Sequence, residues 1–218
     1  MDFFPYGEAE LAYLKKRDKR MAWAIERIGM IQRPIIPDLF QALVHAIIGQ
    51  QISTKAHTTI WGKVQLLTED ITPQSILTLT PETLQSIGIS FKKVGYIRGI
   101  AQTMAEGNLS KSQLQGMTDK EICQTLSALS GIGTWTAEMI MLHTLLRPDV
   151  FSYGDFGILR GLRMLYRHKE IDKKRFERYR KRFSPYGSVV CLYLWAIASG
   201  TIEELTDPIV KQSKRELK

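Results

Sequence analysis

The sequence has few cysteines and no long apolar run. Only Cys123 and Cys191 occur, far apart in 218 residues, so the chain alone cannot build a disulfide framework or a four-cysteine zinc or iron–sulfur site. The longest apolar stretch, 189–198, is too short to span a bilayer, and residues 1–10 are mixed and acidic rather than a basic, apolar leader. We therefore expect a cytoplasmic protein without a membrane partner.

Acidic residues are fewer than basic ones in this sequence. The chain has 30 Lys and Arg against 22 Asp and Glu, a net charge of +8, which favours a polyanionic partner. The stretch 160–182 holds eleven of the basic residues and only three acidic ones. Such a run is typical either of a solvated helical face or of a surface that contacts phosphates, and composition leaves both open.

Helix-start signals recur along the chain. Asp38 is followed three residues later by a glutamine, and Thr72 and Thr80 each precede a proline. Thr118 opens a capping box that Glu121 completes, ahead of apolar residues at helical spacing. These signals predict several well-marked helices.

Strand-like alternation is scarce, so we predict an all-α fold with two helical lobes and a cleft between them, apart from a short extended piece around 150–153. The whole chain, 1–218, is expected to form one functional unit. Its approximate lobes are 38–110 and 111–170, and the terminal segments 1–37 and 171–218 are expected to pack together as part of the second lobe.

A very short link, 129–134 (LSGIGT), joins two expected apolar helices. Gly131 and Gly133 suit a backbone that needs positive φ angles, while Ile132 can plug the space between the helices. The turn leaves N–H groups at the start of the second helix directed outward, where a phosphate oxygen fits. A helical hairpin capped by glycine, without a ligand, is the alternative that the residues leave open.

Four motifs together carry a family resemblance. Residues 129–137 (LSGIGTWTA), followed by 150–155 (VFSYGD), resemble the helix-hairpin-helix (HhH-GPD) DNA glycosylase superfamily. Residues 49–53 (GQQIS) and 184–188 (SPYGS) add a similarity to the 3-methyladenine DNA glycosylase II family of bacteria. The resemblance spans about residues 38 to 198.

The resemblance implies a base excision repair enzyme that works without a cofactor. It would flip an alkylated purine, such as 3-methyladenine or 7-methylguanine, out of duplex DNA and hydrolyse its N-glycosidic bond, which leaves an abasic site. Some members carry an additional N-terminal domain, for which the segment before Asp38 has no room, so we expect the compact form. We expect a monomer that acts on DNA, at the nucleoid if the cell is bacterial.

Asp155 is the catalytic residue that the resemblance implies. Because glycosidic cleavage builds positive charge on the sugar, a nearby carboxylate stabilises the transition state and can orient water. From the residues alone, a helix N-cap is the favoured interpretation of Asp155, and the two roles are compatible. Bifunctional relatives place a lysine just after the hairpin, where this chain has Trp135, so we expect no Schiff-base lyase activity.

The resemblance also implies the DNA contacts. Gln51 is the candidate wedge that fills the gap left by the flipped base, although a solvated helix-end glutamine is an equal interpretation. The implied DNA-binding residues are Gly131, Ile132, Gly133, Thr134, Thr136, Gln50, Gln51 and Ser53.

The base pocket is implied at Tyr186, Trp135, Phe156 and Met139. Electron-rich ring faces suit a cationic, alkylated purine through stacking and cation–π contacts. Simple core packing is the alternative for each aromatic residue.

The sequence identifies no metal site. Its four histidines show no metal-ligand spacing and are interpreted as structural or solvated. The resemblance raises one open alternative, a monovalent cation at the hairpin carbonyls of Ser130, Gly131 and Gly133.

Two other functions stay open at the level of sequence. A non-catalytic helix-hairpin-helix module would bind DNA with a steep salt dependence but release no base. A glycosylase for deaminated bases such as hypoxanthine would keep Asp155 and change the pocket.

Overall fold

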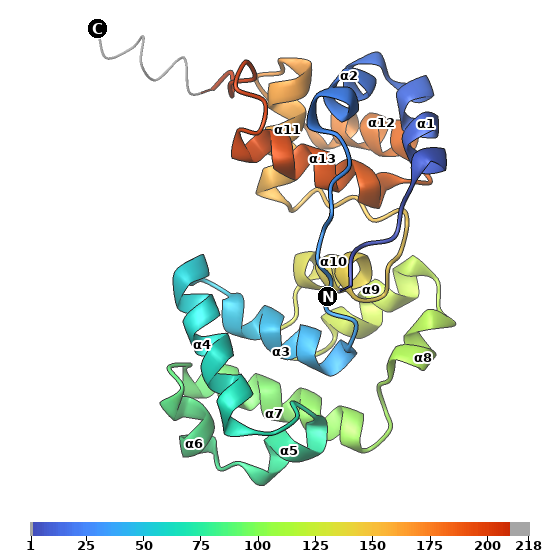
Figure 1. Cartoon of the computed structure of the whole chain (residues 1–218). Coiled ribbons are helices and arrows are strands. Elements are labelled where there is room, and N and C mark those ends of the chain that lie inside the picture. Colours follow the sequence, from blue (N-terminus) through green and yellow to red (C-terminus); the bar gives the residue numbers. More distant parts are fainter. Residues whose placement is uncertain (1, 210–218) are drawn as a thin grey trace, which may run out of the picture. The chain divides into compact units, whose positions relative to one another are not determined.

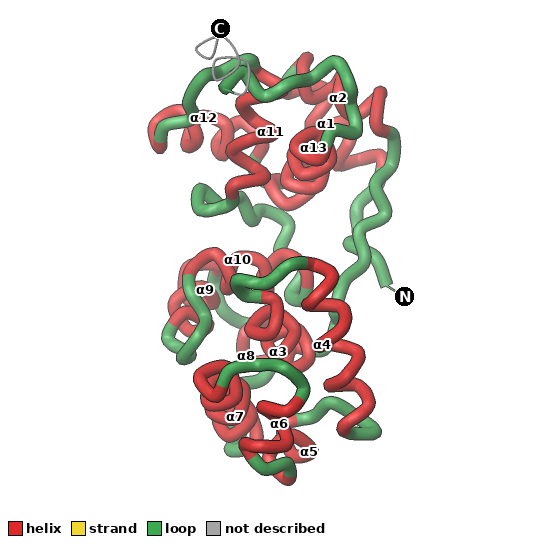
Figure 2. Tube along the Cα trace, turned by 90° about the vertical axis from the view of Figure 1, so that its left-hand side faces the viewer, coloured by secondary structure: helices red, strands yellow, loops and turns green. Residues whose placement is uncertain are grey.

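The computed structural model describes residues 2–209, and helices dominate that range (Figures 1 and 2). The only β-type pairing among the described residues is an isolated antiparallel bridge between Phe3 and Pro34. Residues 150–153, expected to be extended, form no strand. The prediction of an all-α fold is confirmed.

The chain divides into two compact units. The terminal unit contains residues 3–34 and 146–209, and the central unit contains residues 35–145. The helices of the terminal unit are α1 (Glu8–Arg17), α2 (Lys19–Ile28), α11 (Phe156–Tyr166), α12 (Lys173–Phe183) and α13 (Gly187–Ser199). Those of the central unit are α3 (Leu39–Gly49), α4 (Thr54–Leu67), α5 (Pro73–Thr78), α6 (Pro81–Ser86), α7 (Phe91–Ala105), α8 (Lys111–Gln115), α9 (Asp119–Ser127) and α10 (Thr134–His143).

The boundary between the units differs from the one expected near residue 110. Residues 111–145 belong with 35–110, because α10 packs against both α9 and α3. The described parts of the two terminal segments lie in one unit, where α1 contacts α12 and α2 contacts α13. Residues 1 and 210–218 of those segments lie outside the described residues.

The capping signals of the sequence mark real helix starts. The side chain of Asp38 accepts a hydrogen bond from the backbone N–H of Gln41, and Thr72 and Thr80 cap α5 and α6 in the same way. Thr118 and Glu121 form the reciprocal capping box of α9. Each cap satisfies N–H groups that have no partner inside the helix and contributes about 1 kcal/mol.

Within the terminal unit, α11 runs alongside α13 (Figure 1). A Cβ atom at Gly161 would lie 2.4 Å from the backbone oxygen of Leu194, so glycine allows the two backbones to approach this closely. Phe176, Phe183 and Tyr193 are fully buried between the helices of this unit. The apolar stretch 189–198 therefore belongs to a core helix.

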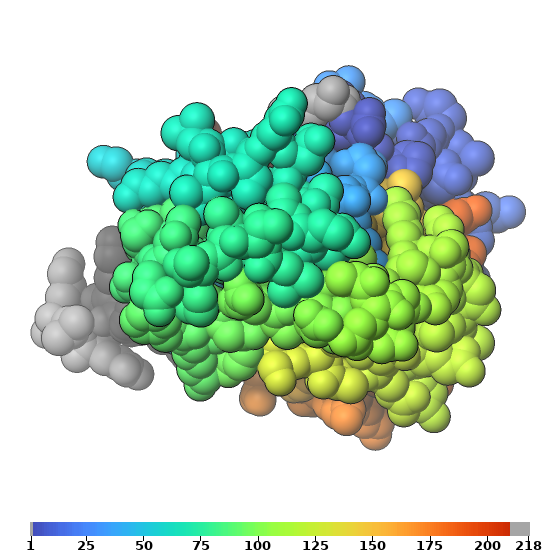
Figure 3. Space-filling view, turned by 90° about the horizontal axis from the view of Figure 1, so that it is seen from below, coloured from blue at the N-terminus to red at the C-terminus, as the bar shows by residue number. Residues whose placement is uncertain are grey.

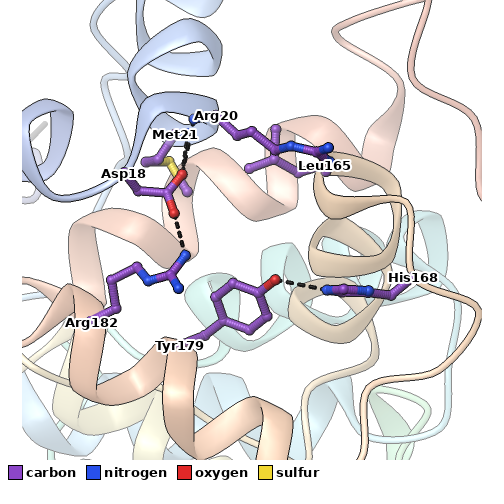
Figure 4. Close-up of polar contacts among 7 residues, drawn as sticks. All are labelled: Asp18, Arg20, Met21, Leu165, His168, Tyr179 and Arg182. Carbon is purple, nitrogen blue, oxygen red and sulfur yellow. Dashed lines mark hydrogen bonds and ion pairs between the residues drawn. The ribbon is translucent and has the colours of Figure 1, made fainter.

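Several basic residues of the 160–182 stretch have structural roles. Arg182 donates to Asp18, which also caps α2 through the N–H groups of Arg20 and Met21 (Figure 4). His168 Nε2 and the Tyr179 hydroxyl lie 2.8 Å apart in the same cluster. Burial lowers the pKa of His168 and neighbouring arginines add to this effect, so the neutral ring is favoured.

Other basic residues on α12, among them Lys173, Lys174 and Arg178, are exposed. Some basic residues of the stretch 160–182 therefore stabilise the fold, and others form a solvated helical face that is open to contact with phosphates.

The central unit is organised around α3. This helix buries apolar side chains on nearly every side, including Phe40, Leu43 and Ile47, and it packs against α4, α7 and α10. Residues of α4 to α8 form a continuous, closely packed outer surface (Figure 3). No helix among residues 2–209 is both long and apolar enough to cross a membrane.

A histidine pair within the central unit should make the fold sensitive to acid. The rings of His45 and His57 are 4.1 Å apart between centroids, and Trp61 contacts His45 edge-on. Burial lowers the pKa of His45 to about 4, with a further contribution from His57. Because its ordinary pKa is about 6.5, the unfolded chain binds the proton first as the pH falls.

We expect the free energy of unfolding to decrease by about 1 to 2 kcal/mol between pH 6.5 and pH 4.5 through this residue, after allowance for its partial exposure. Urea denaturation of the wild type and His45→Gln at both pH values measures the effect. The stability difference between the two proteins should shrink at the lower pH, and a difference that stays constant would contradict the assignment.

Candidate active site

The glycine hairpin connects α9 to α10 in the central unit. Gly131 has φ of +87°, in the region that favours glycine, and its added Cβ would lie 2.4 Å from the ring of Tyr96. Ile132 is buried, and its N–H donates to the carbonyl of Leu129. Positive φ and the absence of a side chain are thus both required at Gly131. The expectation of a positive φ at Gly133 is wrong, since this N-cap residue has φ of −90° and open space around it.

The start of α10 has the form expected of an anion site. Its N-cap is Gly133, which supplies no side-chain acceptor to the N–H groups of the first turn. Gly133 and Thr134 are exposed, but Thr136 is only 6% exposed. Any contact of Thr136 with DNA therefore falls to its backbone, since the side chain faces the core.

The turn after α3 is tied to the hairpin. Gln50 donates from Nε2 to the carbonyl oxygen of Gly131 at 2.8 Å, although the two residues are 81 positions apart. Gln51 follows in a left-handed conformation with φ of +58°, and its side chain is exposed. Ser53 is exposed and serves as the N-cap of α4 by accepting from Ala56 N–H.

Two implied pocket residues lie on α10. Trp135 and Met139 are four positions apart, so they share one face of the helix. Trp135 is 47% exposed, which removes the alternative of simple core packing for this ring, and Met139 is half-buried.

The two hairpin glycines make a matched pair for mutation. Gly131→Ala forces an unfavourable φ and a clash with Tyr96, so we expect a loss of about 2 to 4 kcal/mol of stability together with weaker DNA binding. Gly133→Ala places a disfavoured N-cap residue at α10 but meets no clash, so it should cost no more than about 1 kcal/mol. Thermal unfolding and fluorescence anisotropy with a labelled duplex measure both effects. Equal destabilisation by the two variants would contradict this account of the hairpin.

Asp155 is the N-cap of α11 in the terminal unit. It is 6% exposed, and its Oδ1 accepts a hydrogen bond from the N–H of Ile158 at 2.8 Å. The indole N–H of Trp195 donates to the same oxygen at 3.0 Å. Two donors on one oxygen fix the orientation of the carboxylate, and the prediction that Asp155 caps a helix is confirmed.

Trp195 is a residue beside Asp155 that the sequence interpretation missed. It lies on α13, forty positions after Asp155, and the guanidinium of Arg33 is 5.7 Å from its ring centroid. A Cβ at Gly157 would lie 2.8 Å from Trp195 Cδ1, so glycine at that position lets the indole reach the carboxylate. A glycine two residues into a helix was the available signal, but it could not identify the partner.

The SPYGS motif holds the segment that leads to Asp155. Asp149 accepts from the Ser184 hydroxyl at 2.6 Å and from the N–H of Gly187 at 3.0 Å. Ser188 donates its hydroxyl to the carbonyl of Arg147 and accepts from the N–H of Val150. The motif therefore fastens the start of α13 to the connection that precedes α11.

The other two implied pocket residues, Phe156 and Tyr186, lie in the terminal unit, as Asp155 does. Phe156 follows Asp155 and is 71% exposed, so it is not a core residue. Tyr186 is half-buried and packs edge-on against Tyr13, with ring centroids 5.1 Å apart. Tyr13 also donates its hydroxyl to the carbonyl of Ser184 at 2.6 Å.

No group of three or more potential metal-ligating side chains gathers within residues 2–209. At the hairpin, the Gly131 carbonyl already accepts the hydrogen bond from Gln50. A monovalent cation there would have to use the second lone pair of this oxygen.

Comparison with known proteins identifies the family. Residues 44–185 match the model of the HhH-GPD superfamily of base excision DNA repair proteins. The chain belongs to this superfamily. It is therefore a DNA glycosylase of base excision repair, and DNA is its partner.

Individual relatives of this HhH-GPD protein are named as DNA glycosylases. The chain is 30% identical to the DNA-3-methyladenine glycosylase of Bacillus subtilis over 210 residues, which cover 90% of this chain and 67% of that protein. It is 26% identical to DNA-3-methyladenine glycosylase 1 of Schizosaccharomyces pombe, with 78% of this chain and 76% of that one covered. These names favour a glycosylase over a non-catalytic DNA-binding module.

A solved structure matches the HhH-GPD fold over nearly the whole chain. The crystal structure of DNA-3-methyladenine glycosidase from Bacillus halodurans has a TM-score of 0.83 and 37% sequence identity, with coverage of 94% of this chain and 96% of that one. The predicted helix-hairpin-helix fold is confirmed.

Proposed function

We propose that the chain is a monofunctional alkylpurine DNA glycosylase, which hydrolyses the bond between an alkylated purine and its sugar. The observation that carries the proposal is the carboxylate of Asp155, buried at the start of α11 and oriented by Ile158 and Trp195. The DNA-3-methyladenine glycosylases among the relatives support 3-methyladenine as a target, and 7-methylguanine is the second base that we propose.

In this proposal Asp155 acts on the sugar rather than on the base. Departure of the purine leaves positive charge on the anomeric carbon, and the carboxylate stabilises that charge and orients water for attack on the carbon. An alkylated purine is already cationic, so it leaves without a strong general acid. One carboxylate then suffices for hydrolysis.

The proposed DNA contacts follow the described geometry. Backbone N–H groups from Gly133 onward, at the start of α10, would bind phosphate oxygens, which suits a protein that scans DNA of any sequence. Gln51, exposed at the tip of its turn, would fill the gap left by the flipped nucleotide. The rings of Phe156 and Tyr186, both in the terminal unit, would contact the cationic base.

The monofunctional assignment rests on Trp135. Bifunctional members of the superfamily use a lysine amine just after the hairpin to form a Schiff base with the sugar, and this chain has an indole there. We propose a monomer and a cytoplasmic location, which fits a sequence with only two cysteines, Cys123 and Cys191.

A duplex that carries methylated purines tests the proposal. The chain should generate abasic sites that break only on alkali treatment, and borohydride should trap no protein–DNA adduct. Strand breaks before alkali, together with a trapped adduct, would contradict the monofunctional assignment. Absence of abasic sites at any enzyme concentration would contradict the glycosylase activity itself.

Trp195→Phe tests how Asp155 is positioned. The variant keeps an aromatic ring on α13 but loses the N–H donor to Oδ1. A hydrogen bond to a charged group contributes about 1.5 to 3 kcal/mol, so we expect single-turnover base release to slow at least tenfold. Trp23→Phe, at an exposed tryptophan on α2, is the matched control. Equal rates for both variants would show that the indole does not position the carboxylate.

A further inference from the structure

Lys93 connects two carbonyl oxygens at the end of α3. It lies in the first turn of α7, and its ammonium donates to the carbonyls of Ile48 and Gln50, each at 2.8 Å. Carbonyls at a helix C-terminus lack partners within the helix, and a cation there satisfies them and complements the helix dipole. The lysine therefore fixes the point at which α3 gives way to the turn 50–53.

The contact between Lys93 and the carbonyl of Gln50 also affects Gln51, because this carbonyl belongs to the peptide unit that precedes Gln51. Holding this oxygen against Lys93 sets the direction in which the chain continues, and Gln51 then adopts φ of +58°. A residue other than glycine adopts this conformation only where its surroundings impose it. Lys93 is the side chain that binds the adjoining peptide.

The same face of α7 also supports the glycine hairpin. Tyr96 is three positions after Lys93 and lies over Gly131, at a distance that excludes a Cβ atom. Gln50 closes the arrangement by donating to the carbonyl of Gly131. The turn 50–53 and the hairpin 129–134 are thus both fastened to α7 and to each other.

We infer that Lys93 is a positioning residue for base flipping, which holds Gln51 at a fixed place relative to the DNA-binding hairpin. This inference rests on the proposed function, since it assumes that the turn 50–53 enters the duplex. Loss of the ammonium would free the carbonyl of Gln50 and allow Gln51 to relax from its left-handed conformation. The hairpin would keep its phosphate contacts, so binding to undamaged DNA would change little while insertion into the duplex would fail.

The test compares Lys93→Met and Lys93→Arg with the wild type. Lys63→Met, at an exposed lysine on α4 of the same unit, controls for the loss of one positive charge. A duplex with a tetrahydrofuran abasic analogue and 2-aminopurine as the opposite base reports insertion of the wedge through a rise in fluorescence. This readout requires no base release, so it stays informative even if the chain proves inactive on methylated DNA.

We expect Lys93→Met to lose most of the fluorescence rise in the fully bound complex and to slow single-turnover base release at least tenfold. Its affinity for undamaged duplex should match that of Lys63→Met, and Lys93→Arg should restore most of the fluorescence rise. A full fluorescence rise in bound Lys93→Met would overturn the inference, as would a wild type that shows none. Lower thermal stability with unchanged fluorescence per bound complex would show a structural role only, and would overturn it as well.

Discussion

Asp155→Asn is expected to release methylated purines at least a hundredfold more slowly than the wild type in single-turnover assays. The amide keeps an acceptor oxygen for the N–H groups of Ile158 and Trp195, so the start of α11 should stay intact. What disappears is the negative charge that we propose stabilises the sugar cation, and removal of one such electrostatic contact costs about 10² to 10³ in rate. Affinity for undamaged duplex should be unchanged within about twofold.

Asp172→Asn is the matched control for this variant. Asp172 is also a helix N-cap in the terminal unit, where it accepts from the N–H of Arg175, but it is exposed. The control makes the same change in charge and should retain full activity. Undiminished base release by Asp155→Asn would refute its catalytic role, and equal losses in both variants would indicate a general effect of charge.

Asp207→Ala is expected to lower the free energy of unfolding by about 3 to 5 kcal/mol, because it leaves a buried guanidinium unpaired. Arg163 donates to both oxygens of Asp207, at 3.2 and 2.7 Å, and both side chains are nearly buried. These bonds hold the pKa of Asp207 below its ordinary value, so the contribution of the pair is present at neutral pH and is lost in strong acid.

An exposed ion pair in the same unit provides the comparison. Glu204 pairs with Arg27 at the surface, where both side chains are more than half exposed. Glu204→Ala should therefore change stability by no more than about 1 kcal/mol. Urea denaturation of both variants measures the contrast. Similar losses for the two would mean that burial does not distinguish the pairs.

Local chemistry made much of the fold predictable. Caps such as Thr118 with Glu121 depend only on residues three positions apart, and the helices that these predicted caps open begin where the sequence placed them. The hairpin was predictable for the same reason, since a positive φ at Gly131 is a property of one residue and its neighbours. The N-cap role of Asp155 was predictable as well, because a cap depends only on residues close in sequence.

Contacts between distant segments were not predictable. The boundary near residue 145 depends on the packing of α10 against α3, which no short pattern encodes. The hydrogen bonds from Trp195 to Asp155 and from Lys93 to Gln50 join residues about forty positions apart. A lone tryptophan or lysine in the sequence gives no sign of such a partner. The sequence thus identified the residue proposed to act on the sugar, but not the side chains that contact this residue and the peptide unit before Gln51.

The most direct measurement identifies the bases that the wild-type chain releases from duplex DNA treated with a methylating agent. Chromatography of the soluble fraction should show free 3-methyladenine and 7-methylguanine, in amounts that rise with time and match the abasic sites formed in the DNA. A soluble fraction without methylated purines, from a folded chain that binds the same duplex, would contradict the account.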